Sequence, residues 1–466
     1  MKQGEWIMDF AYPYFQVQFT RDGDLFAPAE FNELVSCVTA KANAPTDLLL
    51  MCHGWNNNIK DASILYSGLA AAIEAQVQAD PALKNRRFAI CGVLWPSKKF
   101  EDKELIPSGA ASLEQAVTTD ALKQRVRDLR SLYGTEDWPS GGSVAPEVFS
   151  KIEALMETMD EDPDDQKEAV DLLRGLMPQE AASTDDGSEV FFDLSTPALI
   201  NKLSRPLTPP PITAGAGAAS LDPFSDGTIS GLGGAAGFRD LFGGIKAGFL
   251  HLLNYTTYYV MKARAGTVGE KGVEPLLEKL RSARPELRLH MIGHSFGCRV
   301  IAAAVNALPR EEKFRPDIVL LLQGAFSHNG FALKNEDNSA DRGAFRDVIE
   351  HQKVRGPILI THTRNDKAVG TAYPVASRIH GVTAAALGDA GDKFGGLGSN
   401  GTQTKTSTPE GVAGTLGEAG SAYPFAARVT SSTPYNLKAD DFIKNHSDIV
   451  HPEVAFALTV AISNNS

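Results

Sequence analysis

The stretch LRLHMIGHSFGCRV, residues 287–300, decides the fold because it joins three patterns in fourteen positions. An apolar run leads into a turn with glycines at 293 and 297, and a run of small and aliphatic residues follows. The first run is typical of a strand buried on both faces, and the last predicts a helix. The small residues around Ser295 serve either packing alone or the display of a nucleophile on a strained corner.

Buried-strand patterns recur along the chain, and segments with helical spacing lie between several of them. The other strand-like runs are short and rich in Leu, Ile and Val, and they cover 46–54, 87–96, 317–327 and 356–363. Helices are predicted over 61–78, where Asp61 is the expected N-cap, and over 241–266, 272–286 and 298–312, the last ended by Pro309. This alternation predicts an α/β fold with a doubly wound, mostly parallel sheet.

The amino-acid composition and net charge of the chain indicate which kinds of binding partner to expect. The chain has 466 residues, 43% of them hydrophobic, and a formal net charge of −12. Nucleic acids and anionic membrane surfaces attract basic proteins, so we expect neither as the main partner. No apolar run reaches the roughly 20 residues of a membrane span, and the N-terminus lacks a signal-peptide pattern. We therefore expect a cytoplasmic protein without stable membrane insertion.

The four cysteines, Cys37, Cys52, Cys91 and Cys298, show no CxxC pair and no Cys/His ligand spacing. Three of them lie in or beside apolar runs, where a free cysteine behaves as a small hydrophobic residue. The sequence thus signals neither a disulfide framework nor a metal site, and no cofactor is expected.

The strand–helix alternation stops between about 100 and 240. We therefore predict a core domain from 1–100 and 240–466, with 101–239 as an inserted cap or lid region. Within the insertion, 204–238 is dominated by Pro, Gly, Ala and Ser, which is typical of a flexible segment. The helix predicted over 241–266 is either a core helix or a wall of a substrate pocket, built from Tyr255, Tyr258 and Tyr259. A second glycine-rich stretch, 388–420, is too long for a simple connection and lacks the setting of a phosphate loop.

A serine hydroxyl is a weak nucleophile and needs a base, which in turn needs a group to orient it. Asp366 follows the apolar run that ends near Thr361, and His446 lies in a loop before the last helical segment. The order Ser295, Asp366, His446 is the one that accompanies a G-x-S-x-G turn on a sheet of this kind. Each residue is expected near the carboxyl end of a strand, where open α/β sheets bind ligands.

Other assignments of these roles remain open from the sequence. Asp366 could instead cap the segment after its turn, and His451 could compete with His446 as the base. Asp448 is close to His446 in sequence, but two positions along the chain is a poor geometry for orienting its ring. His446, His451 and Asp448 lack a further ligand for a metal site. Ser327 also follows a strand, yet no glycine lies two residues beyond it, so we interpret it as a polar cap or pocket lining.

Acyl transfer also requires hydrogen-bond donors for the developing oxyanion. The stretch LLLMCHGWNNN, 48–58, follows the first buried strand with a glycine that lets the backbone bend toward the serine. We expect the backbone N–H groups of Trp55 and Phe296 to form the oxyanion hole. The alternative is an ordinary glycine-containing loop with a helix cap within 56–58.

With these residues assembled, the chain resembles the α/β-hydrolase superfamily, and within it a group of bacterial members. The resemblance covers about 45–100 and 240–460, and it is carried by HGWNN (53–57), LWPS (94–97), GHSFG (293–297) and RNDKA (364–368). The last stretch favours Asp366 as the acid. The resemblance implies hydrolysis of ester or acyl bonds without a metal, but the fold hosts many chemistries and does not name a substrate.

The sequence therefore predicts a serine hydrolase of the carboxylesterase or lipase-like kind, with Ser295, Asp366 and His446 as a catalytic triad. The expected partner is a small-molecule or lipid ester substrate. A thioesterase, an amidase or a phospholipase on the same triad, and a non-catalytic scaffold used for binding, remain as alternatives.

Overall fold

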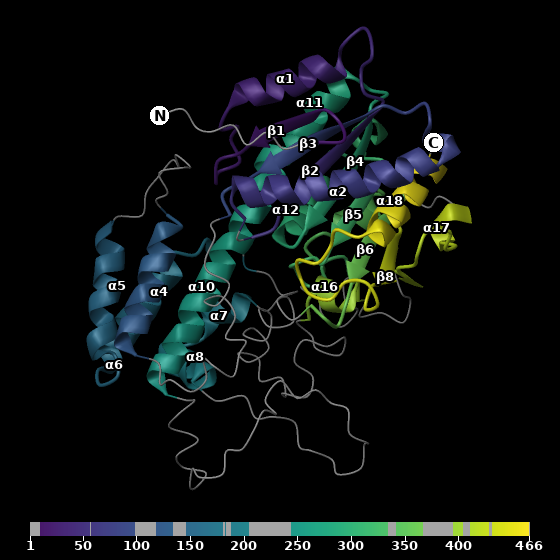
Figure 1. Cartoon of the computed structure of the whole chain (residues 1–466). Coiled ribbons are helices and arrows are strands. Elements are labelled where there is room, and N and C mark those ends of the chain that lie inside the picture. The colour runs from purple at the N-terminus through teal and green to yellow at the C-terminus, as the bar shows by residue number, and fades with distance from the viewer. Residues whose placement is uncertain are drawn as a thin grey trace, which may run out of the picture.

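The computed structural model describes residues 10–55, 57–97, 118–133, 146–179, 182, 188–204, 244–333, 342–366, 395–403, 411–427 and 431–465. In this part of the chain one 8-stranded sheet has the order β1-β3-β2-β4-β5-β6-β8-β7, and all of its strand pairs are parallel (Figure 1). The chain is thus an α/β protein. The strands are β1 Tyr14–Gln18, β2 Asp47–Cys52, β3 Phe88–Leu94, β4 Arg288–His294, β5 Ile318–Leu322, β6 Ile358–His362, β7 Val412–Thr415 and β8 Pro434–Lys438.

Helices cover both faces of the sheet, which explains why its central strands are apolar at every position. In β2, Leu48 and Leu50 belong to one hydrophobic core, whereas Leu49 and Met51 belong to the other. The first core lies under α1 (Pro28–Val38), α11 (Glu274–Ala283) and α12 (Phe296–Ala307). The second lies under α2 (Ile59–Ala79) and α18 (Pro452–Asn464), which lie side by side in Figure 1. Successive residues of a strand point to opposite faces, so two cores require two apolar sets.

The five strands predicted from the sequence are all present as β2 to β6. Three others, β1, β7 and β8, escaped the sequence analysis. β1 and β7 lie at the edges of the sheet and β7 is mostly exposed, so neither has the continuous apolar pattern of a covered strand. β8 begins with Pro434 and includes Asn436 and Lys438, residues that are rare in strands.

The predicted start of α2 is wrong by about one turn. The helix begins at Ile59 with Asn58 as its N-cap, whose side chain accepts a hydrogen bond from the N–H of Asp61 at 2.8 Å. The Asp61 carboxylate accepts one in return from the N–H of Asn58 at 3.3 Å. Asp61 is therefore the second half of a capping box rather than the cap itself. The predicted end of α12 before Pro309 is confirmed.

A group of helices lies beside the sheet in the part of the sequence between β3 and α10 (Ile245–Thr267), and α10 runs along it toward α12 (Figure 1). Arg264 of α10 is buried and donates to the carbonyl oxygens of Pro96 and Leu132, at 2.8 Å each. The boundaries of the predicted insertion, 101–239, stay a prediction, and its segment 205–238 lies outside the described residues. The group consists of α4 Thr119–Ser131, α5 Pro146–Thr158, α6 Pro163–Gly175, α7 Glu189–Asp193 and α8 Thr196–Leu203.

The remaining elements are short. A π-helical turn, Val268–Val273, joins α10 to α11, and 3-10 turns lie at Pro81–Leu83 and Glu312–Phe314. Short helices are α13 Arg346–Glu350, α16 Leu397–Asn400 and α17 Pro424–Ala427. No described helix is both long and apolar enough to cross a lipid bilayer.

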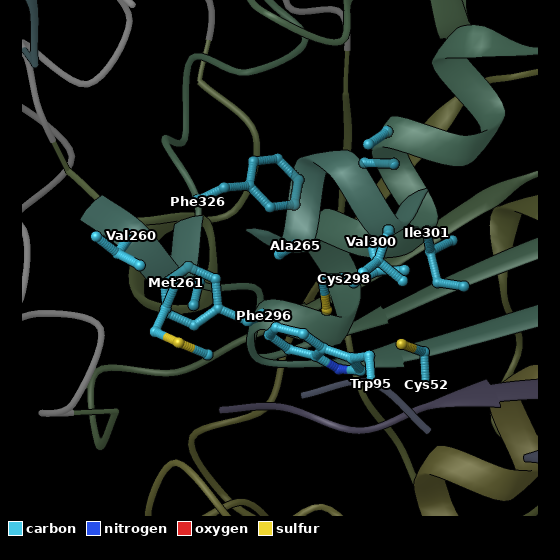
Figure 2. Close-up of a cluster of buried hydrophobic side chains, with 14 of the residues drawn as sticks. Cys52, Trp95, Val260, Met261, Ala265, Phe296, Cys298, Val300, Ile301 and Phe326 are labelled. Carbon is cyan, nitrogen blue, oxygen red and sulfur yellow. The ribbon is translucent and has the colours of Figure 1, made fainter. Parts of the chain in front are cut away.

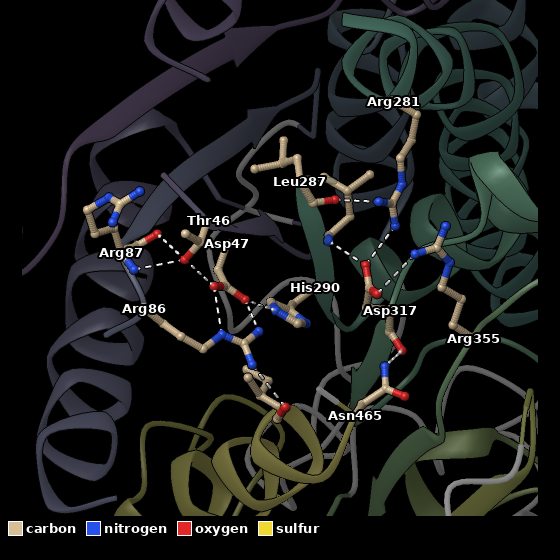
Figure 3. Close-up of polar contacts among 12 residues, drawn as sticks. Thr46, Asp47, Arg86, Arg87, Arg281, Leu287, His290, Asp317, Arg355 and Asn465 are labelled. Carbon is tan, nitrogen blue, oxygen red and sulfur yellow. Dashed lines mark hydrogen bonds and ion pairs between the residues drawn. The ribbon is translucent and has the colours of Figure 1, made fainter. Parts of the chain in front are cut away.

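Buried charge pairs lie near the amino ends of the central strands (Figure 3). Asp47, the first residue of β2, accepts hydrogen bonds from Nε of Arg86 and from Nε2 of His290, at 2.8 Å each. Burial alone would raise the pKa of Asp47, but these two partners outweigh it and hold the pKa well below its ordinary value. Asp317 similarly accepts from Arg281 at 2.6 Å and from the backbone N–H of Leu289 at 2.8 Å. These pairs thus lie at the amino ends of the strands, whereas Ser295 lies at the carboxyl end of β4.

Candidate active site

The three side chains predicted as a triad meet at the carboxyl edge of the sheet. Ser295 follows β4, Asp366 lies in the turn after β6, and His446 lies in the loop after β8. The imidazole Nε2 of His446 is 2.8 Å from Ser295 Oγ, and its Nδ1 is 2.8 Å from Asp366 Oδ2. Parallel strands end at the same edge, so residues far apart in sequence converge there.

Ser295 occupies a strained corner between β4 and α12. Its φ of 56° and ψ of −123° lie in a region that a residue with a side chain rarely adopts. Three hydrogen bonds hold the corner: the Ser295 N–H donates to the carbonyl of Leu322 at 3.0 Å, and its carbonyl accepts from Cys298 and Ala325 at 3.1 Å each. The strain is local, and the surrounding backbone maintains it.

The two glycines of the turn are required by close contacts between backbones. A Cβ on Gly297 would lie 2.1 Å from the carbonyl oxygen of Cys52, and one on Gly293 would lie 2.7 Å from the nitrogen of Cys298. Any side chain would therefore push α12 away from the ends of β2 and β4. Figure 2 shows how Phe296 and Cys298 pack into the buried cluster that this close approach creates.

His446 has the protonation pattern that a base needs. A carboxylate accepts hydrogen bonds and does not donate them, so Nδ1 of His446 carries a proton and its N–H donates a hydrogen bond to Asp366. Nε2 is then the unprotonated nitrogen and faces the hydroxyl of Ser295. The Ser295 and Asp366 residues are only 5% and 2% exposed, so water competes little for these hydrogen bonds. The arrangement can move a proton from Ser295 to His446.

The turn that carries the acid is tied to the loop that carries the histidine. Asn365 donates from Nδ2 to the carbonyl oxygens of Asp440 and Ile443, at 3.0 and 2.8 Å. Thr363 donates from Oγ1 to the Asp440 carboxylate at 3.0 Å. The separation of Asp366 and His446 is therefore set by these side-chain hydrogen bonds as well as by the one between the two residues.

The neighbours of Asp366 include a buried glutamine that the sequence analysis missed. Gln323 follows β5 with a φ of 49°, is fully buried, and places Nε2 3.4 Å from Asp366 Oδ2. Part of the glycine-rich stretch 388–420 also packs here, since a Cβ on Gly398 would lie 2.9 Å from the same carboxylate oxygen. Ser399 Oγ donates to the backbone carbonyl of Asp366 at 3.2 Å. In the sequence, Gln323 could have been noticed as a polar residue directly after the apolar run of β5.

The alternative acid and base are paired with each other. His451 Nε2 lies 2.9 Å from Asp448 Oδ1, and Asp448 also accepts from the N–H of Lys444 at 2.9 Å. Asp448 therefore stabilises the loop around His446 through His451 and Lys444. The segment that Asp366 could cap instead begins at 367 and lies outside the described residues, and the Asp366 N–H itself donates back to the carbonyl of Thr363 at 3.2 Å.

Ser327, the other serine that follows a strand, lies in a turn of its own. Its Oγ accepts a hydrogen bond from the N–H of Asn329 at 3.1 Å, and its backbone forms a bridge to Gly396. The residue is buried, as expected for a polar cap. It thus has a local structural role.

The predicted oxyanion loop lies against the serine. A Cβ on Gly54 would lie 2.5 Å from Ser295 Cβ and 3.1 Å from its Oγ, so this approach requires glycine. The next residue, Trp55, packs its ring edge-on against Phe296, with centroids 5.7 Å apart. Phe296 is the first residue of α12, where a backbone N–H has no partner within the helix. The cap predicted as the alternative is also present, at Asn58.

Two buried histidines near the serine were not assigned roles from the sequence. His294 donates from Nε2 to the backbone carbonyl of His446 at 2.9 Å, and the two rings are 5.0 Å apart. Burial, together with the nearby His446, lowers the pKa of His294 to about 3, so this ring stays neutral at pH 7. Burial also lowers the pKa of His53, before Gly54, to about 4. In the sequence, only their positions directly before Ser295 and Gly54 pointed to these two histidines.

Only one of the three tyrosines considered as a pocket wall lies at the serine corner. The ring of Tyr258 is 5.3 Å from that of Phe296. Tyr255 is 5.1 Å from Phe191, and Tyr259 donates its hydroxyl proton to the carbonyl of Pro178 at 3.1 Å. Tyr255 and Tyr259 are four positions apart and share the helix face that packs on the neighbouring helices. For them the core-helix interpretation is correct.

Among the described residues, no group of three or more His, Cys, Asp or Glu side chains is placed to hold a metal ion. Comparisons of the chain with protein-family models, with curated proteins and with solved structures found no match.

Proposed function

We propose that this protein is a serine hydrolase that cleaves carboxylic esters through an acyl-enzyme intermediate. The observation that carries the proposal is the chain of two 2.8 Å hydrogen bonds from Ser295 through His446 to Asp366. A serine on a strained corner and an oriented imidazole together form the arrangement that nucleophilic catalysis requires.

In the proposed first step, Ser295 Oγ attacks the ester carbonyl while His446 Nε2 takes the hydroxyl proton. Asp366 holds the ring and stabilises the imidazolium that forms. The carbonyl oxygen becomes an oxyanion, which accepts hydrogen bonds from the N–H groups of Trp55 and Phe296. When the tetrahedral intermediate collapses, the proton on Nε2 passes to the leaving alcohol and the acyl group stays on Ser295.

In the second step, water takes the place of the alcohol. His446 removes a proton from the water, which attacks the acyl carbon, and the same two N–H groups again receive the negative charge. Collapse of this intermediate releases the acid and returns the proton to Ser295. No step needs a group beyond the side chains, the two amides and water.

We also propose the α/β-hydrolase fold for the sheet domain. The serine follows the central strand β4, the acid and the histidine follow later strands, and the oxyanion loop follows the neighbouring β2. This arrangement agrees with the resemblance carried by GHSFG and RNDKA. We propose a small-molecule or lipid ester as the substrate, and the rings of Trp55 and Tyr258, which pack on Phe296 beside Ser295, favour an apolar acyl group.

The test is turnover of p-nitrophenyl butyrate by the whole chain and by Ser295→Ala, with Ser327→Ala as the matched control. We expect Ser295→Ala to lose activity by a factor of at least about 10³, and Ser327→Ala to keep it. A fluorophosphonate probe should label the wild-type protein and the control, but not Ser295→Ala. A folded Ser295→Ala with full activity would rule out the mechanism.

Two further results would decide whether the protein is an enzyme and which kind of bond it cleaves. If the folded wild-type protein neither turns over esters nor reacts with the probe, a binding scaffold is the better description. Esters of graded chain length, a thioester, an amide and a phospholipid would identify the bond and the acyl group, and faster turnover of the thioester or amide would overturn the ester assignment.

A further inference from the structure

Four residues of the stretches 53–57 and 94–97 form one hydrogen-bonded cluster behind the predicted oxyanion loop: His53, Asn57, Trp95 and Ser97. His53 and Ser97 are 2% and 4% exposed, and Trp95 is 1% exposed. The indole N–H of Trp95 donates to the His53 carbonyl at 2.9 Å, and the His53 and Trp95 rings stack with centroids 5.8 Å apart. None of these side chains has a role in the mechanism above.

The direction of each hydrogen bond around His53 can be assigned. The backbone N–H of Trp95 is only a donor, and it lies 3.3 Å from His53 Nε2, so this nitrogen is unprotonated. The proton is therefore on Nδ1, which donates to the carbonyl oxygen of Gly54 at 2.9 Å. Burial lowers the pKa of His53 to about 4, which keeps the ring neutral at pH 7, and the two hydrogen bonds select this tautomer.

A second donor reaches the same carbonyl oxygen. Asn57 donates from Nδ2 to the carbonyls of Gly54 and Trp55, at 3.2 and 3.1 Å. Ser97 holds Asn57 in turn, since its Oγ lies 3.1 Å from the Asn57 carbonyl and 3.3 Å from His53 Nδ1. The carbonyl of Gly54 is thus fixed from one side by two side chains.

A fixed carbonyl also fixes the amide that follows it. In a planar trans peptide the C=O of Gly54 and the N–H of Trp55 point in opposite directions. The backbone of this segment has no cis peptide bond, so the Trp55 N–H points away from His53 and Asn57. Gly54 itself lies against Ser295, where a Cβ would be only 2.5 Å from the serine Cβ.

We propose that His53 is a positioning residue that, with Asn57 and Ser97, aims the Trp55 N–H at the oxyanion. This inference rests on the proposed function and extends it. Oxyanion donors are effective because they are oriented before the reaction, so that no free energy is spent on reorienting them in the transition state. The cluster provides that orientation from behind the loop, without contact with the substrate.

The experiment compares His53→Leu with His290→Leu, a buried histidine whose hydrogen-bond partner Asp47 lies at the other end of the sheet. His53→Leu loses the buried hydrogen bonds to Gly54 and Trp95, and His290→Leu loses the one to Asp47, so both should unfold more easily than the wild-type protein. Only His53→Leu should lose kcat/KM toward p-nitrophenyl butyrate, by about 10²–10³ as when one oxyanion donor is removed, with KM changed by less than about threefold. Binding of an alkyl trifluoromethyl ketone, whose adduct with Ser295 carries an oxyanion, should weaken by a similar factor.

The outcomes separate this inference from the proposed function. If the wild-type activity depends on Ser295 but His53→Leu retains both kcat/KM and ketone affinity, the positioning role is overturned and the hydrolase proposal stands. A parallel loss in both histidine variants would also overturn it, because the effect would then be general instability. Histidine ¹⁵N spectra give a test without turnover: His53 should be the neutral Nδ1–H tautomer from pH 5 to 8, and an Nε2–H tautomer contradicts the inference.

Discussion

Nε2 of His446 lies 2.8 Å from Oγ of Ser295, although 151 residues separate the two in the chain. The same ring reaches Asp366 on its other side at 2.8 Å, across 80 residues. A second acid–histidine pair, Asp448 and His451, is joined to Lys444 of the same loop and, at 3.9 Å, to Glu453 at the start of α18. This pair provides matched controls for the proposed roles.

Asp366→Asn should reduce kcat by about 10³–10⁴, because the amide no longer selects the tautomer of His446 that accepts the serine proton. Asp448→Asn changes the same chemical group in the neighbouring pair and should cost less than about tenfold in kcat. Steady-state turnover of p-nitrophenyl butyrate at saturating substrate measures both. Equal losses in the two variants would contradict the assignment of Asp366 as the orienting acid.

Gly54→Ala should impair turnover with little effect on the global fold. The added Cβ would lie 2.5 Å from Ser295 Cβ, so either the serine corner or the oxyanion loop must move. Displacements of about 1 Å at a reacting group cost about 10²-fold in rate, and we expect a loss of kcat/KM of that order.

The matched control is Gly175→Ala, at the end of α6, where an added Cβ meets nothing within 4 Å. This variant should keep full activity and equal or slightly higher thermal stability. Wild-type kcat/KM in Gly54→Ala, or a comparable loss in Gly175→Ala, would count against close contact between the loop and Ser295.

Stability should fall as the pH drops below the ordinary histidine pKa. Burial lowers the pKa of His53 to about 4 and that of His294 to about 3, from 6.5. Between pH 6.5 and 4 the unfolded chain binds protons at both positions and the native protein does not, so protons favour unfolding. The free energy of unfolding therefore has its full value above pH 6.5 and decreases toward pH 4. The decrease is on the order of 3 kcal/mol for His53 alone.

Urea unfolding at pH 7.5 and at pH 4.5 measures this dependence. His294→Gln removes one of the two groups and should reduce the difference in unfolding free energy between the two pH values. An unchanged difference in that variant would show that His294 is not kept neutral by the fold.

Asp47→Ala should destabilise the fold by about 3–5 kcal/mol, because it leaves the Arg86 guanidinium buried without its carboxylate partner. Asp22→Ala removes an exposed carboxylate that pairs with Arg21 at 3.7 Å and should cost less than about 1 kcal/mol. Below the unfolding temperature both variants should keep wild-type kcat/KM, since these residues lie away from the serine corner. Thermal unfolding, monitored by circular dichroism, tests whether Asp47→Ala destabilises the protein more than Asp22→Ala.

Much of this architecture could be predicted from the sequence because its determinants are local. Covered strands such as β2 and β5 are apolar at every position, and the β4–α12 turn needs glycine where backbones nearly touch. The order of Ser295, Asp366 and His446 along the chain was equally visible. The edge strand β7 escaped prediction because an exposed strand carries no such pattern.

What the sequence by itself determined is which residue types follow the covered strands β2 to β6, and which lie before the last helix. Only the tertiary structure decided that His446 faces Asp366 while His451 faces Asp448, that Tyr258 lies at the serine corner, and that His53 holds the Gly54 carbonyl. The physical reason is the distance along the chain over which each kind of interaction acts. Strand, helix and turn preferences act over a few neighbouring residues, whereas these hydrogen bonds and ring contacts form only after packing brings distant segments within a few ångströms of each other.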